Sequence, residues 1–420
     1  MYIKLGNMRI KNSSFHRAPI TLVIAVIITI SALGKIILSD YRPKSFSSAE
    51  STQEAEIVKN PETPVPESGQ RKKLLFEETL TIGVSEGDEN YMFGQSLYVN
   101  MDYEGCFFVT DWDRKHIRKF NPDGKYLLTI GRPGQGPGEF QNVWGPKFDT
   151  SGNLYVRDIS NKKISFFSKS GDFIKGINTP QDLGDVTILP NSTYFTSKTE
   201  MIEDPKVHKF IHVYGIYDTE FNLKTEFERI EQNIRQRENK SQAQFIAGIL
   251  SSSAFKPYFV QEVTKDGTIY TGNAETYEIK IYSQKGGLKR IVTREYQPIK
   301  VSQTHKDYYF EVQSIDLLRR LPSGDSFKEE VRKHMEYPKF LPAYSWFTVM
   351  ENNWLYVAVD VIEGDYALID LFDEQGVYIG QFRSNLPTPQ VNFKNRLAYA
   401  VVTVDDYKFI KVYTYKIQEY

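Results

Sequence analysis

Residues 102–111 read Asp-Tyr-Glu-Gly-Cys-Phe-Phe-Val-Thr-Asp, and residues 149–158 read Asp-Thr-Ser-Gly-Asn-Leu-Tyr-Val-Arg-Asp. Each copy opens with Asp-x-x-Gly, continues through a mainly apolar run and ends on aspartate. The agreement continues downstream at the same offset, where Gly124 matches Gly171. A repeat spacing of roughly 40–50 residues, with several short strands in each repeat, is typical of β-propellers and related repeat arrays. The sequence therefore predicts an all-β repeat protein.

Each copy predicts a sequence of short strands joined by tight turns. The Asp-x-x-Gly segment favours a turn, because aspartate can bond to nearby backbone groups and glycine tolerates a positive φ. The run that follows is apolar at successive positions, so the strand must be covered on both faces. Two further strands are expected in the first copy, over 117–120 and 126–130, and two in the second, over 164–167 and 173–177.

A glycine-rich connection lies between the two copies and carries a family resemblance. It reads Gly-Gln-Gly-Pro-Gly-Glu-Phe over residues 134–140, and the second copy with its Asn-Leu-Tyr-Val run follows. This combination resembles the NHL repeat of six-bladed β-propellers of the exported bacterial type. The resemblance is specific over residues 102–177 and implies a fold more than a function, because one fold hosts many unrelated functions.

The ends of the chain predict how the propeller closes. Leu80-Thr-Ile-Gly83 repeats Leu128-Thr-Ile-Gly131, which ends the outer strand of the first copy, but no blade precedes it. The last repeat contains strands at 397–404 and 409–416 without an outer strand of its own. We therefore expect a six-bladed β-propeller over residues 74–420, closed by an N-terminal outer strand, because closure removes open sheet edges.

Two insertions interrupt the repeats, at residues 229–256 and 301–343. The second is predicted to be helical over about residues 303–340, because its apolar residues recur at roughly helical spacing. Both lie between blades, and the resemblance places such connections on one rim of the disc. We therefore expect both insertions to decorate the same face.

The N-terminal region predicts export. Residues 1–39 contain Lys4, Arg9, Lys11, Arg17 and Lys35 with no acidic residue, and the stretch 20–38 is almost continuously apolar. A basic segment before an apolar run directs export. The run predicts either a single-pass anchor in the cell membrane, with the propeller outside the cytoplasm, or a signal cleaved near Gly34 that leaves a periplasmic or secreted protein. Residues 40–73 are rich in Ser, Glu and Pro and predict a disordered linker.

No catalytic or metal-binding set is evident from the sequence. The glycine-rich loop is followed by a strand, whereas a phosphate loop needs a helix N-terminus. Asp111, Asp158 and Asn273 share one repeat position, which favours loop capping over metal binding. The six histidines lack metal-ligand spacing, and the single cysteine, Cys106, lies within a predicted strand. We therefore expect no catalytic residues, metal ligands or cofactor.

The remaining candidates suggest a binding face. Loops on one rim carry aromatic and basic residues of the kind found at protein interfaces, namely Trp112, Arg114, Lys115, Arg132 and Arg157. We expect a membrane-tethered module that binds an envelope protein or a small ligand. A nucleic-acid partner is disfavoured, because the chain has a net charge of −1 although its first 39 residues are basic, so the body is acidic.

The alternative is an enzyme resembling the lactonase- and lyase-type propellers. Such enzymes hold a divalent metal such as calcium in the central channel. Gln261 and Glu262 are the notable polar pair on a predicted inner strand.

Overall fold

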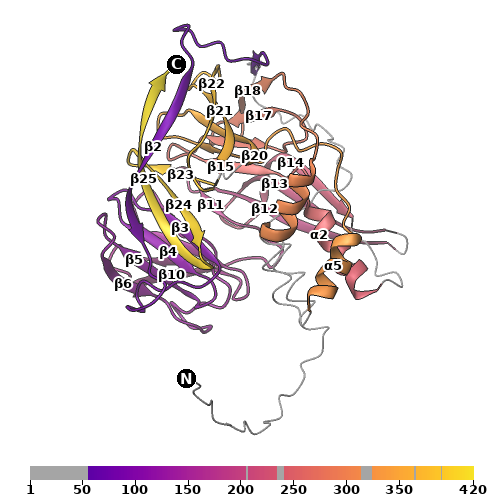
Figure 1. The fold of residues 1–420 in the computed structure, drawn as a ribbon. Helices are drawn as coiled ribbons and strands as arrows, with labels where there is room; N and C mark the ends of the chain where they lie inside the picture. The colour runs from indigo at the N-terminus through magenta and orange to yellow at the C-terminus, as the bar shows by residue number, and fades with distance from the viewer. Residues whose placement is uncertain (1–54, 205–206, 234–240, 314–323, 364–365, 389) are drawn as a thin grey trace, which may run out of the picture.

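The computed structural model describes residues 55–204, 207–233, 241–313, 324–363, 366–388 and 390–420. The predicted export segment, residues 1–39, lies outside them. Within the described residues the strands form six sheets, and the strand Lys72–Ile82 lies beside the C-terminal strand Tyr407–Glu419 (Figure 1). The protein is a six-bladed β-propeller, as the sequence predicts. No helix among the residues described here is both long and apolar enough to cross a membrane.

Each blade is a sheet in which the first strand along the chain lies at one edge, and the last lies at the other. Blades 1 to 3 have the strand orders β3-β4-β5-β6, β7-β8-β9-β10 and β11-β12-β13-β14. These strands are β3 (Leu97–Met101), β4 (Phe107–Asp111), β5 (His116–Phe120), β6 (Tyr126–Ile130), β7 (Lys147–Phe148), β8 (Leu154–Asp158), β9 (Lys163–Phe167), β10 (Phe173–Asn178), β11 (Thr187–Ile188), β12 (Tyr194–Asp204), β13 (Val207–Tyr217) and β14 (Leu223–Asn233).

Blades 4 and 5 follow the same scheme, and blade 6 combines both ends of the chain. Their strand orders are β15-β16-β17-β18, β19-β20-β21-β22 and β23-β24-β25-β2. These strands are β15 (Val260–Val263), β16 (Ile269–Gly272), β17 (Glu278–Tyr282), β18 (Leu288–Arg294), β19 (Trp346–Val349), β20 (Leu355–Glu363), β21 (Tyr366–Phe372), β22 (Tyr378–Arg383), β23 (Asn392–Lys394), β24 (Leu397–Val404), β25 (Tyr407–Glu419) and β2 (Lys72–Ile82).

The expected closure by an N-terminal outer strand is confirmed. Strand β2 pairs antiparallel with β25 from Lys72 opposite Glu419 to Ile82 opposite Ile410. The side chains of Leu74, Phe76 and Ile82 are buried there. The pairing satisfies backbone groups that an unpaired edge would leave exposed, and it joins the two ends of the ring.

Residues before β2 differ from the predicted linker over 40–73. Strand β1 (Glu56–Asn60) pairs in parallel with β18 and adds a fifth strand to blade 4. The buried Asn60 amide donates to the carbonyls of Thr293 and Gly376 at 3.0 and 2.9 Å, and its oxygen accepts from the Tyr378 backbone at 2.8 Å. This segment therefore links blades 4 and 5 before β2 enters blade 6. The sequence gives little indication of strand β1, because only two of its residues are apolar and they stand among polar ones.

The turns between the first two strands of each early blade have the expected chemistry. Oδ1 of Asp102 accepts hydrogen bonds from the backbone N–H groups of Glu104 and Cys106, both at 2.9 Å. Oδ1 of Asp149 accepts from Ser151 and Asn153 in the same way. Gly105 has a φ of +87°, which explains the glycine at that position.

Both insertions contain helices, whereas the sequence predicted a helix only in the second. The first carries α2 (Gln242–Ser253), and the second carries α3 (Gln303–Tyr308), the π-helix η1 (Tyr309–Gln313) and α5 (Asp325–Lys333). Their apolar side chains form one cluster in which Ile246 and Leu250 of α2 join Phe310 and Val331. The expectation that both insertions lie on one face is confirmed by this packing (Figure 1).

Candidate functional site in the central channel

A cavity of the described chain lies at one mouth of the central channel. It has a volume of about 810 Å³, and every blade contributes to its wall. Its lining includes the turns that follow the first strand of each blade, at Tyr103, Thr150, Pro190, Lys265, Asn353 and Asn395. The helical insertions connect a last strand to the next first strand, so they belong to the opposite rim. The cavity therefore opens away from the helices.

Polar side chains at this mouth join neighbouring blades. Nζ of Lys147 lies 2.6 Å from Oδ2 of Asp185, which links blades 2 and 3. The two oxygens of Glu351 accept from the backbone N–H groups of Asn395 and Arg396 at 2.7 and 2.8 Å, which links blades 5 and 6. Hydrogen bonds and ion pairs between blades thus stabilise the channel wall. A ligand would bind to the polar groups of the wall that are not engaged in these contacts.

Glu262 on β15 is the acidic group whose protonation is most altered at this site. Its carboxylate accepts from the backbone N–H of Val349 at 2.9 Å and from Oγ1 of Thr348 at 3.2 Å. Burial raises its pKa to about 7, and these two hydrogen bonds only partly oppose that effect. Its neighbour Gln261 also lines the cavity, and its Oε1 is buried without a hydrogen-bond partner in the described chain. Glu262 can therefore exchange a proton near neutral pH.

A second feature of the mouth combines two lysines with one tyrosine. Nζ of Lys265 from blade 4 and Nζ of Lys394 from blade 6 each lie 4.3 Å from the centroid of the Tyr103 ring of blade 1. Nζ of Lys394 also donates to the Met101 carbonyl at 2.6 Å. Burial lowers the pKa of Lys394 to about 8. Blades distant in sequence thus meet over one aromatic ring.

The residues present do not fit the divalent metal of the alternative interpretation. No group of three or more His, Cys, Asp or Glu side chains in the described chain is arranged to hold a metal ion. At the channel mouth, Asp185 is paired with Lys147, and Glu351 is engaged with two backbone N–H groups. Calcium prefers six to eight oxygen ligands, several of them from carboxylates. Glu262 alone does not provide such a set.

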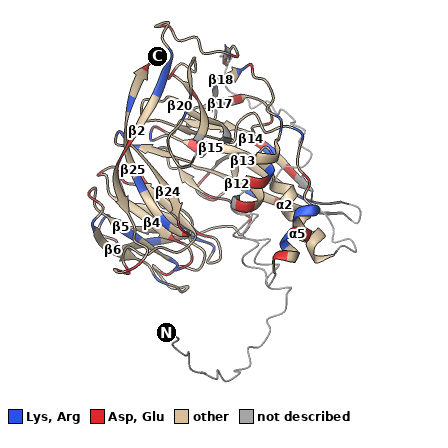
Figure 2. Cartoon of the chain, in the orientation of Figure 1, with Lys and Arg blue, Asp and Glu red and all other residues tan. Residues whose placement is uncertain are grey.

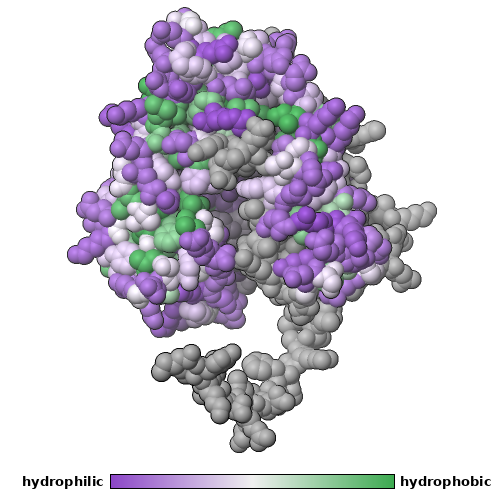
Figure 3. Space-filling view, viewed as in Figure 1, coloured by the Kyte–Doolittle hydropathy of each residue, from purple (hydrophilic) through white to green (hydrophobic). Residues whose placement is uncertain are grey.

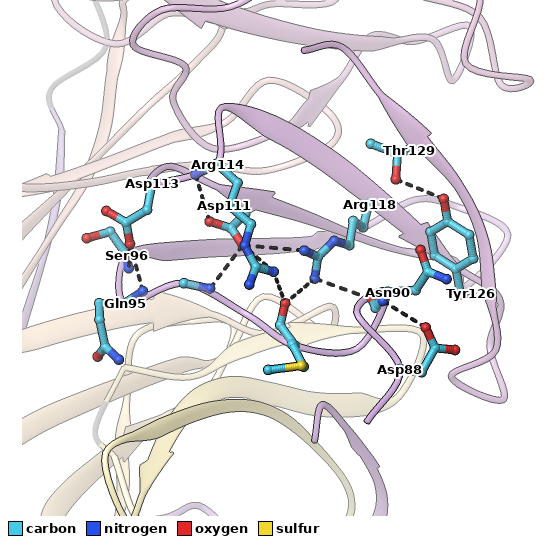
Figure 4. A network of polar contacts seen from close by, with 12 residues as sticks. Asp88, Asn90, Gln95, Ser96, Asp111, Asp113, Arg114, Arg118, Tyr126 and Thr129 are labelled. Carbon is cyan, nitrogen blue, oxygen red and sulfur yellow. Dashed lines mark hydrogen bonds and ion pairs between the residues drawn. The ribbon is translucent and has the colours of Figure 1, made fainter. Parts of the chain in front are cut away.

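The predicted rim residues Trp112 and Arg114 lie in the loop between β4 and β5, at the opposite rim from the cavity. Half-buried Trp112 donates from Nε1 to Oδ1 of Asn142 at 2.6 Å. Arg114 belongs to the network of Figure 4, in which it donates to the Met92 carbonyl and lies 3.8 Å from Oδ2 of Asp111. Both side chains are therefore engaged in contacts within the chain.

The recurring aspartates cap loops, as the sequence suggests. Buried Asp111 accepts from the backbone N–H groups of Gly94 and Arg114 at 3.0 and 3.1 Å (Figure 4). Asp158 in blade 2 accepts from those of Gln141 and Asn142 at 2.7 and 3.1 Å. In each blade the carboxylate ties the incoming connection to the second strand.

The other three predicted binding residues have different environments. Lys115 has a φ of +57° and matches Lys162, with a φ of +50°, so its position serves the turn of the repeat. Arg132 has a side chain that is 79% exposed and pairs with Glu139 at 2.9 Å. Arg157 is only 2% exposed, which places it in the interior rather than on a binding face. The sequence did not predict the burial of Arg157, because the burial follows from the position of its strand, which is covered on both faces.

Replacement of Arg157 by methionine is expected to destabilise the fold. Arg157 donates from Nε to the Gly184 carbonyl at 2.7 Å and from its terminal nitrogens to Leu183 and to Oγ1 of Thr179. Because the buried carbonyls would lose their donors, we expect a loss of roughly 3 kcal/mol in the free energy of unfolding, measured by urea denaturation. The exposed control Arg132→Ala should change it by less than about 0.5 kcal/mol. Equal midpoints for both variants would contradict the structural role of Arg157.

Comparison with known proteins identifies the family. A family described as "6-bladed beta-propeller" matches residues 87–319, which is more than half of the chain. The chain belongs to this family. Protein lin-41 of Caenorhabditis elegans is 42% identical over 48 residues, which are 11% of this chain and 4% of that protein. The chain thus matches only a small part of that relative.

Three solved structures are similar to this chain at low sequence identity. A Bacteroides fragilis protein inferred to be exported is 12% identical, with 86% of this chain and 99% of that chain covered and a TM-score of 0.48. Virginiamycin B lyase from Staphylococcus aureus is 10% identical, with coverage of 82% and 99% and a TM-score of 0.39. A gluconolactonase from Xanthomonas campestris is 9% identical, with coverage of 76% and 88% and a TM-score of 0.35.

Proposed function

We propose that this six-bladed propeller is an NHL-like binding module outside the cytoplasm that holds a small polar ligand in the mouth of its central channel. The cavity is the observation that supports this proposal. Its volume of about 810 Å³ falls within the roughly 300–1,000 Å³ of small-molecule sites. It combines aromatic side chains such as Phe148 and Trp346 with a few polar groups, including Glu262 and Lys394.

The channel supports this function better than the opposite rim does. At that rim Trp112 and Arg114 are engaged in bonds to Asn142 and to the Met92 carbonyl, and Arg157 is buried. The face seen in Figure 3 is mostly hydrophilic, with apolar patches among hydrophilic residues. A large apolar docking surface would mark a protein partner more clearly.

The distribution of charge fits a small ligand better than nucleic acid. Lysine and arginine are interspersed with aspartate and glutamate over the visible ribbon, including α5 (Figure 2). Binding to a phosphate backbone depends on a concentrated basic surface. A binding assay in which the propeller binds an envelope protein instead of a small ligand would support the alternative partner.

The proposed location rests on the N-terminal sequence. Four basic residues precede the apolar run 20–38 and a fifth, Lys35, lies near its end, and a Ser-, Glu- and Pro-rich stretch separates this run from the propeller. We propose that the run holds the propeller at the outer side of the cell membrane, with release by cleavage near Gly34 as the alternative. The N-terminal sequence of the mature protein distinguishes the two: a start at Lys35 supports cleavage.

The test of channel binding is a thermal-shift screen of small polar compounds, with hits measured by calorimetry on Glu262→Gln. The amide keeps the size of the side chain but cannot ionise. We expect the affinity for a hit to change roughly tenfold or more, because Glu262 lines the cavity and burial alters its protonation. Arg132→Ala at the opposite rim should bind as the parent protein does. If every hit bound Glu262→Gln and the parent equally, Glu262 would not form part of a ligand site in the channel mouth.

Glu262→Gln is also expected to change how the free energy of unfolding depends on pH. The pKa of Glu262 rises from its ordinary 4.5 to about 7 in the folded protein, so folding favours the protonated form. Protonation of Glu262 therefore contributes to the free energy of unfolding below about pH 4.5. This contribution decreases as the pH rises toward 7. Glu262→Gln stays neutral and should lack this component of the pH dependence.

An enzymatic role is the second candidate, and Glu262 is the observation that favours it. A carboxyl group with a pKa near the working pH can act as a general acid or base. Turnover of a bound compound that stops in Glu262→Gln while binding persists would favour the enzyme over the binding module.

A further inference from the structure

The arrangement of Lys265, Lys394 and Tyr103 specifies the channel site further. Both ammonium groups lie over the same aromatic ring, and neither forms a salt bridge within the part of the chain that the structure describes. The third lysine of the mouth, Lys147, is by contrast paired with Asp185 at 2.6 Å. Two cations that share a neutral ring repel each other, and a bound anion would relieve that repulsion.

The carboxylates around this lysine pair are committed to other donors. Oδ1 of Asp102 accepts two backbone N–H groups, and Glu351 accepts two more. Asp266 accepts from the Thr264 hydroxyl and from the backbone and hydroxyl of Thr268. Glu262 bonds to Thr348 and Val349 on the neighbouring blade. The lysine pair therefore offers a ligand positive charge that no salt bridge of the described chain engages, beside the unpartnered Oε1 of Gln261.

We propose that the channel ligand is a small polyhydroxylated anion, such as a sugar acid, whose anionic group binds between Lys265 and Lys394 beside the Tyr103 ring. This inference rests on the proposed function, because it names the ligand class of the same site. Lysine ammonium groups and an anionic oxygen form charge-assisted hydrogen bonds, which are roughly twice as strong as neutral ones.

The rest of the wall fits the hydroxylated part of such a molecule. Hydroxyl and amide side chains line the same cavity as the lysine pair, including Asn100, Thr150, Thr187 and Thr348. The ring of Phe148 lies 5.3 Å from Nζ of Lys394 and provides an apolar face for a carbon skeleton. A cavity of about 810 Å³ is also far larger than a bare inorganic ion needs.

The test compares probes that share a skeleton and differ in charge. Glucuronate, glucose and glucosamine are titrated into the full-length protein by calorimetry, with inorganic phosphate as an anion without a skeleton. We expect glucuronate to bind most tightly, with an affinity that falls as salt is added. Phosphate should bind more weakly if the skeleton contributes. Equal or tighter binding of glucose or glucosamine would overturn the anion inference and leave the channel-binding proposal in place.

Variants at Lys265 provide the matched comparison, because this residue is exposed and its removal leaves the hydrogen bonds and ion pairs between blades intact, with loss of the contact to the Tyr103 ring alone. Lys265→Met should weaken glucuronate binding roughly tenfold or more, whereas Lys265→Arg should retain it. Lys125 is also exposed and lies in the turn after β5 at the same rim, so Lys125→Met is the control and should bind as the parent does. Unchanged binding to Lys265→Met, or no binding of glucuronate to the parent protein at millimolar concentration, would refute the lysine-pair site.

Discussion

Removal of residues 1–84 is expected to abolish the folded state, because it removes β2 from blade 6. The buried side chains of Leu74, Phe76 and Ile82 would be lost from that blade. Burial of a large apolar side chain contributes roughly 1.5–3 kcal/mol, so three of them approach the total stability of about 5–15 kcal/mol of a typical domain. In addition, β25 would become an open edge that can pair with other chains. We expect aggregation and the absence of a cooperative melting transition.

Two shorter deletions serve as controls for this effect. Removal of residues 1–54 leaves every contact of the described chain in place and should not change the melting temperature. Removal of residues 1–70 also removes β1 and the Asn60 hydrogen bonds, but it retains β2. We expect that protein to fold with reduced stability. If the 1–84 deletion melted like the 1–70 deletion, β2 would not be the strand that closes the ring.

Replacement of Asp370 by alanine is the second change with a large expected effect. Oδ2 of Asp370 lies 3.1 Å from a terminal nitrogen of Arg294 and accepts from the Tyr277 hydroxyl at 2.6 Å. Oδ1 accepts from Tyr378 and Gln381, both at 2.9 Å. The two charged side chains are only 0% and 6% exposed. Because Asp370→Ala leaves the Arg294 charge buried without its partner, we expect a loss of roughly 3–5 kcal/mol in the free energy of unfolding.

A double-mutant cycle distinguishes this ion pair from simple loss of packing. The Arg294→Met change in the Asp370→Ala background removes the uncompensated charge, so the double variant should be more stable than the sum of the single effects predicts. Contacting residues in one network typically show coupling of roughly 0.5–3 kcal/mol. Urea denaturation of the four proteins measures it. Additive effects would show that the pair does not act as a unit between blades 4 and 5.

The sequence by itself determined the blade pattern and its closure. The Asp-x-x-Gly turns and the apolar strands are local features, and the structure realises them through short-range hydrogen bonds such as those of Asp102 and Asp149. The repeat of Leu80–Gly83 also predicted the closing strand, because a strand without a blade must pair with a blade that lacks one. Loop capping by Asp111 and Asp158 followed from their shared repeat position.

Only the tertiary structure decided which residues share the channel and which polar residues are buried. Lys265, Lys394 and Tyr103 are far apart in sequence and meet because ring closure brings first-strand turns to one mouth. The sequence predicts that Glu262 is a polar residue on an inner strand, but its raised pKa depends on burial against blade 5. Arg157 resembled a surface arginine, yet β8 lies between two covered faces and points it at the connection to blade 3. Local sequence encodes turns and strand periodicity, whereas contacts across blades depend on a closed ring that no local pattern specifies.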